Sequence, residues 1–309
     1  MHKEKVLIIK PGYSETLDGE ISMITSLGDV IRSTALLHLY ENAHVTWLVD
    51  ETAFPLLKGN PFIHRILSYN LTSILQLQSE RFDTVINLEK VPGLCAFSDS
   101  INAWRRYGFR FDPENGVALA YDSSQHVLAI CMDPEYKKAA KKYWVENLSE
   151  MVGAKWKGEG YILGYKPKSD VIYDIGFNYD VGKKWPNKAW PMEYWKELER
   201  LVGKKYTISW QQGLKDIEEY FEWINSCNVF VTNDSLGLHI ASALNKKIIA
   251  LFGPTLAFEI YLPNGVKLLP EFDYDCIPCL SQRCTQSKLC MDYIKPQKVF
   301  DTIEKVIKG

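Results

Sequence analysis

A cluster of polar side chains lies between two apolar segments, and its residue types suit the binding of phosphate groups or sugar hydroxyls. The run Thr-Asn-Asp-Ser occupies residues 232–235, and His239 stands about one helical turn further along. Where a helix begins, free backbone N–H groups and the positive end of the helix dipole attract anions. The cluster therefore indicates either a ligand site or a simple N-cap formed by Asp234 or Ser235.

The flanking segments predict a strand, a helix and a second strand around this cluster. Phe230 and Val231 favour a strand before it, and residues 248–252 form a continuous apolar run of the kind buried in parallel sheets. A Gly-Pro-Thr turn follows at residues 253–255. Ligands of open α/β sheets bind outside the carboxyl ends of the strands, so we expect the cluster and this turn at one sheet edge.

The rest of the chain also alternates between strand and helix patterns, which predicts βαβ units around parallel sheets. The expected strands are residues 6–10, 45–49, 65–67, 84–88, 127–131, 171–177 and 206–210. The expected helices are residues 27–39, 52–57, 71–78, 134–152, 192–202 and 217–226. Residues 155–169, rich in Gly, Lys and Pro, separate the two series, so the fold class is α/β with two Rossmann-like domains.

We place the N-terminal domain at residues 1–165 and the C-terminal domain, with a cysteine-rich segment at 276–290, at residues 170–295. A terminal helix begins at Pro296 and carries Val299 and Ile303 on one face. Residues 11–25 form a long first βα loop, which is either a binding element or a surface insertion.

Several of these segments together resemble the lipopolysaccharide heptosyltransferases, a family of glycosyltransferases. The resemblance rests on order and spacing along nearly the whole chain, although Leu236 stands where the family has Gly and Gly237 follows one place later. The matching segments are residues 6–10, 26–36, 45–49, 184–186, 232–244, 250–255 and 276–291.

The resemblance implies a GT-B-type architecture of two facing Rossmann-like domains, with the terminal helix packed back on the N-terminal domain. It also implies inverting transfer of a heptose from a nucleotide-activated donor, ADP-heptose, to a lipopolysaccharide core acceptor. The expected donor-binding residues are Lys184, Thr232, Asn233, Asp234, Ser235, Leu236, Gly237, His239, Gly253, Pro254 and Thr255. The expected acceptor-side residues are Lys10, Ser26 and Gly28, and acceptor choice is expected in the loops at 11–25 and 90–115.

Glycosyl transfer needs a base for the acceptor hydroxyl, and Asp29 is the candidate. It stands near the start of the first helix of the N-terminal domain, where a carboxylate also simply stabilises the helix dipole. The family's proposed base corresponds to Asp29, and this favours the catalytic interpretation.

The departing diphosphate needs positive charge, and Lys184 before Trp185-Pro186 is the expected clamp, with Lys183 as an adjacent competitor. Asp234 is expected to bind sugar hydroxyls, because a carboxylate next to a diphosphate would otherwise repel it. We expect no catalytic metal, because a lysine and a helix N-terminus can stabilise the departing diphosphate in place of a divalent ion.

Four of the seven cysteines crowd into 15 residues, at Cys276, Cys279, Cys284 and Cys290. Such spacing is compatible with a structural zinc or iron site, with two disulfides, or with four free thiols. We predict a structural metal with no part in sugar transfer.

Composition excludes several other classes of function. A net charge of −2 provides no electrostatic basis for nucleic acid binding. No apolar run reaches the roughly 18 residues of a membrane span, so we expect a cytoplasmic protein, with peripheral contact to the inner membrane left open. The expected partners are a nucleotide sugar and a glycan or lipid-linked glycan. The alternatives are transfer to a protein or another small acceptor, a nucleotide-sugar epimerase, and a non-catalytic sugar-nucleotide-binding protein.

Overall fold

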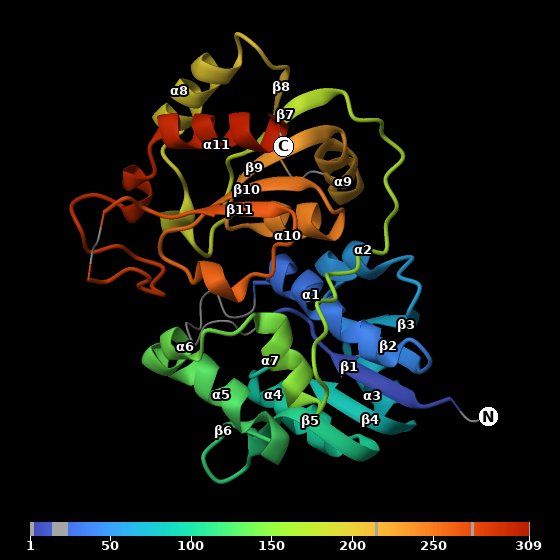
Figure 1. Ribbon diagram of the computed structural model, residues 1–309. Helices are drawn as coiled ribbons and strands as arrows, with labels where there is room; N and C mark the ends of the chain where they lie inside the picture. The colour runs from blue at the N-terminus through green and yellow to red at the C-terminus, as the bar shows by residue number, and fades with distance from the viewer. Residues whose placement is uncertain (1–2, 14–23, 214–215, 273–274, 309) are drawn as a thin grey trace. The chain divides into compact units, whose positions relative to one another are not determined.

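The computed structural model describes residues 3–13, 24–213, 216–272 and 275–308. The chain divides into two compact units, Met1–Tyr165 and Lys166–Gly309 (Figure 1). Most of the predicted loop at 11–25 lies outside the described residues.

The first unit is built on a six-stranded sheet in the order β3-β2-β1-β4-β5-β6. Its strands are β1 (Lys5–Ile9), β2 (His44–Val49), β3 (Ile63–Ser68), β4 (Arg81–Asn87), β5 (Asn102–Asp112) and β6 (Val117–Ala120). The first five run parallel, whereas β6 pairs antiparallel with β5. The strand order reverses between β1 and β4, which is the point where open α/β sheets bind ligands.

The helices of this unit connect the strands and cover the sheet. They are α1 (Leu27–Ser33) continued by the 3₁₀ helix η1 (Thr34–Tyr40), η2 (Glu51–Ala53), α2 (Phe54–Leu57), α3 (Leu71–Gln78), α4 (Pro92–Ser100), η3 (Asp122–Ser124), α5 (Gln125–Met132), α6 (Pro134–Ala140) and α7 (Trp144–Met151). Apolar residues of β1 and β4, among them Leu7, Ile9 and Val85, pack with Leu94 of α4 in a buried core.

Two sequence predictions fail in this unit. Residues 127–131, expected as a strand, belong to helix α5, whose Val127 and Ile130 are buried at helical spacing. A short apolar run fits either structure, and only its packing decides. The single helix expected at 134–152 is broken into α6 and α7 by Lys141, which adopts a left-handed backbone with φ of 44°.

The second unit contains a five-stranded parallel sheet in the order β11-β10-β9-β7-β8. Its strands are β7 (Tyr173–Asn178), β8 (Ile208–Trp210), β9 (Cys227–Asn233), β10 (Lys247–Leu251) and β11 (Gly265–Leu268). Its helices are η4 (Pro186–Lys188), α8 (Met192–Val202), α9 (Ile217–Asn225), α10 (Leu236–Ala243), η5 (Ala257–Glu259), η6 (Cys290–Tyr293) and α11 (Pro296–Lys308). Here the strand order reverses between β7 and β9, so their carboxyl ends are the expected ligand site.

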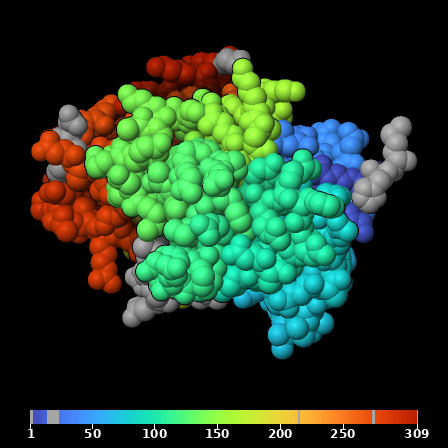
Figure 2. Space-filling view, turned by 90° about the horizontal axis from the view of Figure 1, so that it is seen from below, coloured from blue at the N-terminus to red at the C-terminus, as the bar shows by residue number. Residues whose placement is uncertain are grey.

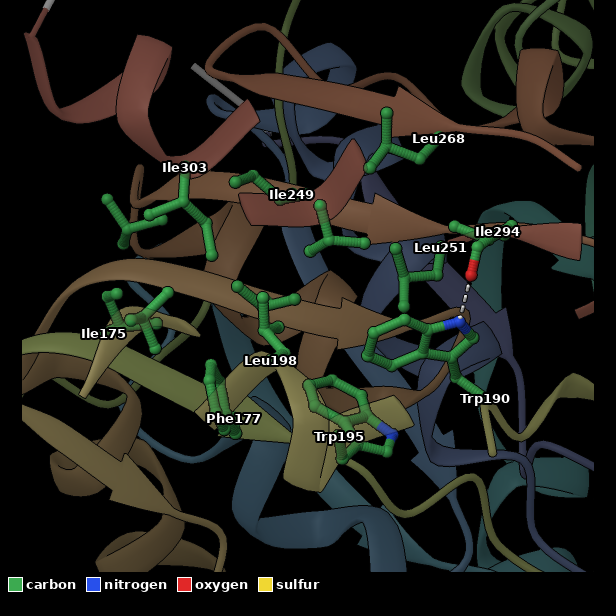
Figure 3. Packing of buried hydrophobic residues seen from close by; sticks show 14 of the residues in the cluster. Ile175, Phe177, Trp190, Trp195, Leu198, Ile249, Leu251, Leu268, Ile294 and Ile303 are labelled. Carbon is green, nitrogen blue, oxygen red and sulfur yellow. Dashed lines mark hydrogen bonds between the residues drawn. The ribbon is translucent and has the colours of Figure 1, made fainter. Parts of the chain in front are cut away.

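The terminal helix α11 packs in the core of the second unit, and its expected packing on the N-terminal domain stays a prediction. Its buried Val299 and Ile303 join the core formed by Ile249, Leu198 and their neighbours. The close-up in Figure 3 shows Ile303 in this core. Lys205, just after α8, also pairs with Glu304 at 2.8 Å. The apolar face of the helix is therefore buried within its own unit.

Candidate functional site

The polar cluster predicted from the sequence lies where β9 ends and α10 begins. Thr232 and Asn233 end the strand and are fully buried, and Ser235 occupies the N-cap position of the helix without making a side-chain cap bond. This is the carboxyl end of β9 beside β7, where the strand order reverses. The simple N-cap interpretation is therefore insufficient, because neither Ser235 nor Asp234 is used that way in the described hydrogen bonds.

Asp234 is held by partners from two other turns. The Lys188 Nζ atom lies 2.8 Å from Asp234 Oδ2, and Thr255 Oγ1 donates a hydrogen bond of 2.7 Å to the same oxygen. The carboxylate is only 8% exposed. Burial alone would raise its pKa, but the charges of Lys188 and His239 and the hydrogen bonds outweigh burial and hold the pKa well below its usual range.

Lys188 is a site residue that the sequence interpretation missed. It ends η4, its ammonium lies 5.0 Å from the centroid of the Trp185 ring, and it forms the ion pair with Asp234. A signal was present, because the Lys-x-Trp-Pro pattern occurs twice: at residues 183–186 and again at residues 188–191. The second occurrence contacts the cluster, whereas the role of the half-buried Lys184 stays a prediction.

Gly237 is explained by a buried network behind the cluster. Asn178, at the end of β7, donates to Thr232 Oγ1 at 2.7 Å and to Ser235 Oγ at 2.9 Å, and it accepts from Tyr220 Oη at 2.7 Å. A Cβ atom at position 237 would overlap both Tyr220 Oη and Asn178 Nδ2. The glycine is thus needed at 237 for close packing, and the half-buried Leu236 takes the preceding position.

The Gly-Pro-Thr turn follows β10 and contacts the cysteine-rich segment, which we define as Cys276–Cys290. Leu280 N donates to Pro254 O at 2.8 Å, and the sulfur atoms of Cys290 and Met291 fill the space where a Cβ of Gly253 would stand. The predicted turn residues therefore lie between Asp234 and this segment.

The four thiols of that segment lie near one another, and none is in a disulfide. Burial, followed by the neighbouring Cys279, Cys284 and Cys276, raises the pKa of Cys290 to about 11. Among the described residues, no three Cys, His, Asp or Glu side chains are assembled into a ligand set for one ion. The donor chemistry suits zinc or iron, but the arrangement of the thiols does not itself support the predicted metal site.

Asp29 occupies the first turn of α1 in the first unit and lines a pocket at the point where that sheet's strand order reverses. The carboxyl group is buried, and Arg32 Nη1 lies 3.3 Å from Asp29 Oδ1. The pocket is lined by Lys10, Asp29, Ser33, Leu88, Lys90, Phe109, Val127, Cys131, Trp144, Leu148 and Met151. Its covering helices α5 and α7 belong to the face of this unit drawn in green in Figure 2.

A buried carboxylate supports this pocket from behind. Glu89 is fully buried, lies 3.2 Å from Lys10 Nζ, and accepts hydrogen bonds from the backbone N–H groups of Gly12 and Tyr13. Ser26 N donates to Gly12 O at 2.7 Å, which ties the start of α1 to the same loop stem. Lys10 thus lines the pocket, whereas Ser26 and Gly28 lie near Asp29 outside its lining. The acceptor-side role of all three stays a prediction.

Glu89 and Lys90 are residues that the sequence interpretation did not select. They directly follow the strand predicted at residues 84–88. They could have been selected by the rule that ligands bind at the carboxyl ends of the strands between which the strand order reverses. Phe109 and Trp144 carried no comparable signal, because they reach the pocket through tertiary packing.

Comparison with known proteins identifies the class of the segment that holds the Asp234 cluster. Residues 213–289 match the family profile described as glycosyltransferase family 9 (heptosyltransferase). Lipooligosaccharide heptosyltransferase 2 of Campylobacter jejuni subsp. jejuni is 32% identical over 122 residues, which cover 36% of this chain and 38% of that protein. The match thus spans well under half of that relative, and it confirms the resemblance predicted from the sequence.

The solved structure of E. coli ADP-heptose lipopolysaccharide heptosyltransferase II has a TM-score of 0.69 at 17% identity and covers 98% of both chains. The iron-containing dodecameric glycosyltransferase TibC from enterotoxigenic E. coli has a TM-score of 0.60 at 11% identity, over 99% of this chain and 76% of its own. These likenesses show the fold, and the predicted α/β class with two Rossmann-like domains of the GT-B type is confirmed. Among the described residues, no helix combines the length and apolar character needed to cross a bilayer.

Proposed function

We propose that the protein is an inverting glycosyltransferase that transfers a heptose from ADP-heptose to a hydroxyl of a lipopolysaccharide core acceptor. The observation that carries the proposal is the Lys188–Asp234–Thr255 cluster at the start of α10. Asp234 and Thr255 lie inside the segment that matches family 9. A buried ion pair beside a helix N-terminus supplies both a hydroxyl-binding carboxylate and positive charge for a diphosphate.

In this proposal the second unit binds the donor. Asp234 accepts hydrogen bonds from sugar hydroxyls, and its Lys188 partner offsets the repulsion between a carboxylate and a diphosphate. The Lys188 ammonium has three N–H donors, so it can pair with Asp234 and still donate to a leaving phosphate oxygen. The first N–H groups of α10 lack intrahelical acceptors and point out of the end of the helix that follows Asp234. Lys184, Leu236, Gly237 and His239 complete the proposed donor site.

The first unit supplies the base and the acceptor subsite. Asp29 takes the proton of the acceptor hydroxyl as that oxygen attacks the anomeric carbon and the nucleoside diphosphate departs. The lining residues suit a sugar, since they include the aromatic side chains of Phe109 and Trp144 and the ammonium groups of Lys10 and Lys90. The positive charge on the donor side comes from lysine and a helix N-terminus, so the chemistry as proposed needs no catalytic metal.

A panel of nucleotide sugars and nucleoside diphosphates in a thermal-unfolding assay tests this function. A ligand that binds only the folded state raises the melting temperature by mass action, and we expect ADP and ADP-heptose to raise it most. Product analysis should then show transfer only when an acceptor glycan is present. Conversion of the donor without any acceptor would identify an epimerase, and binding without turnover would identify a non-catalytic binding protein.

We also propose that the four cysteines hold one structural zinc or iron ion, which fixes a segment that has little regular secondary structure. Four thiolates form a suitable donor set, and the four cysteines Cys276, Cys279, Cys284 and Cys290 stand within 15 residues of sequence. We expect about one equivalent of metal by elemental analysis of protein purified without a metal-affinity resin. Stoichiometric absence of metal together with disulfides in mass spectra would refute the proposal. A cytoplasmic location, with or without peripheral membrane contact, remains a prediction.

A further inference from the structure

The cysteine-rich segment contacts both turns that supply the partners of Asp234. On one side, Asn187 Nδ2 donates to Ser281 O at 2.6 Å, and Asn187 directly precedes Lys188. On the other side, Leu280 N donates to Pro254 O at 2.8 Å, and Pro254 directly precedes Thr255. Two consecutive residues of the segment therefore bridge the two turns.

The end of the segment adds a packing contact to the second turn. The space beside Gly253 is filled by Cys290 Sγ and Met291 Sδ, which leaves no room there for a side chain. Any displacement of Cys290 would therefore change the support under the Gly-Pro-Thr turn. Interiors are close-packed, so such a shift is transmitted to the turn rather than absorbed.

These contacts matter because the two turns have little support of their own. The helix η4, which carries Lys188, is only three residues long, and the Gly-Pro-Thr turn has no regular secondary structure. Lys188 Nζ and Thr255 Oγ1 converge on a single carboxylate oxygen of Asp234, so a small movement of either turn would lengthen the contact that this turn makes with Asp234. Asn187 itself is only 7% exposed. The hydrogen bond from its side-chain amide to Ser281 O joins residues that are far apart in the sequence.

We propose that the cysteine-rich segment is a positioning element for the donor site, and that Asn187, on the Lys188 turn, is the positioning residue through which it acts. It holds the Lys188 turn and the Thr255 turn so that both reach Asp234, and the affinity for the donor's nucleoside diphosphate depends on that support. The inference rests on the proposed function to the extent that the Asp234 cluster binds a nucleotide sugar. It extends that function by assigning the segment a role in donor affinity and not only in folding.

The chain offers a matched control for the test. Asn225 Nδ2 also donates to a serine backbone carbonyl, Ser169 O, at 2.7 Å, but at the end of α9 and apart from the Asp234 cluster. Asn187→Ala and Asn225→Ala thus each remove one amide-to-carbonyl hydrogen bond within the same unit, and Asn225→Ala also removes a 3.2 Å hydrogen bond to Ser169 Oγ. The dissociation constant of ADP is measured by calorimetry on the full chain, and amide hydrogen exchange is measured on the protein without nucleotide.

We expect Asn187→Ala to raise the ADP dissociation constant about tenfold and Asn225→Ala less than about twofold. Exchange in Asn187→Ala should accelerate locally, at the amides of Lys188, Ala189, Trp190 and Leu280, which are hydrogen-bonded in the structure. A general loss of stability would instead accelerate exchange across the strands of the unit.

Wild-type behaviour of Asn187→Ala in both measurements would overturn the inference, as would equal effects of the two variants on ADP binding. If the wild-type protein binds no ADP, the proposed function fails. The exchange data then decide whether the segment positions the two turns. If the wild type binds ADP and Asn187→Ala binds it equally well, the inference fails while the proposed function stands.

Discussion

Asp29→Asn is expected to lower turnover by at least about a hundredfold, the usual scale for the loss of a general base. An amide has the shape of the carboxylate and still accepts a hydrogen bond from Arg32, but it cannot take the proton of the acceptor hydroxyl. The melting temperature and the affinity for ADP should stay close to those of the wild type. Steady-state kinetics, thermal unfolding and calorimetry measure the three quantities.

Glu146→Gln serves as the control, because Glu146 is also an acidic residue in the first turn of a helix of the same unit. Both substitutions remove a charge that stabilises a helix N-terminus, an effect of about 0.3–1 kcal/mol. Only Asp29→Asn should abolish turnover. Full activity of that variant, or unfolding of the protein, would reduce Asp29 to a helix-stabilising residue.

Lys188→Met is expected to lower the free energy of unfolding by about 3–5 kcal/mol at neutral pH, the usual cost of leaving a buried charge without its partner. It should also weaken ADP binding, because Lys188 is the proposed contact to the departing diphosphate. Replacing both residues, as Lys188→Met with Asp234→Asn, should restore much of the stability but not the ADP affinity. Equal stability of the single variant and the wild type, in urea unfolding, would contradict the buried ion pair.

The pH dependence gives a second check on the same pair. The pKa of Asp234 lies below its unfolded value of about 3.9, so its stabilisation is complete above pH ~4 and is lost only as the pH falls further. Without the charge of Lys188, less opposes the effect of burial on Asp234, so the pKa of Asp234 rises. A proton then binds the folded variant more readily, so the stability difference from the wild type should narrow between pH 8 and pH 5.

The ADP affinity of Lys184→Ala, measured alongside, tests the lysine that the sequence favoured.

The local patterns predicted most of the elements around the Asp234 cluster because the relevant residues are contiguous. Residues 229–255 form a strand, a turn, a helix and a second strand, and the apolar runs alone predicted that order. Lys188 was missed because the same Lys-x-Trp-Pro pattern occurs twice within nine residues, 183–191, and only the ion pair with Asp234 selects the second. Composition and spacing do not distinguish between the two copies of the pattern.

The first unit shows where local patterns fail. The apolar run in α5 fits a strand or a helix, and its packing beside the pocket decided for the helix. The strand pair β5 and β6 was not predicted, and Phe109 of β5 reaches the pocket only through that pairing. Glu89, fully buried between Lys10 and two backbone N–H groups, is a long-range arrangement that no local pattern encodes.

The place of α11 has a consequence for how this chain can be varied. Because the helix completes the core of the unit that precedes it in sequence, all elements of residues 166–309 are encoded without interruption. A crossover in the segment before β7 would therefore exchange the helix α11 together with the sheet that it covers. The residues of the terminal helix thus stay together with the core in which they pack.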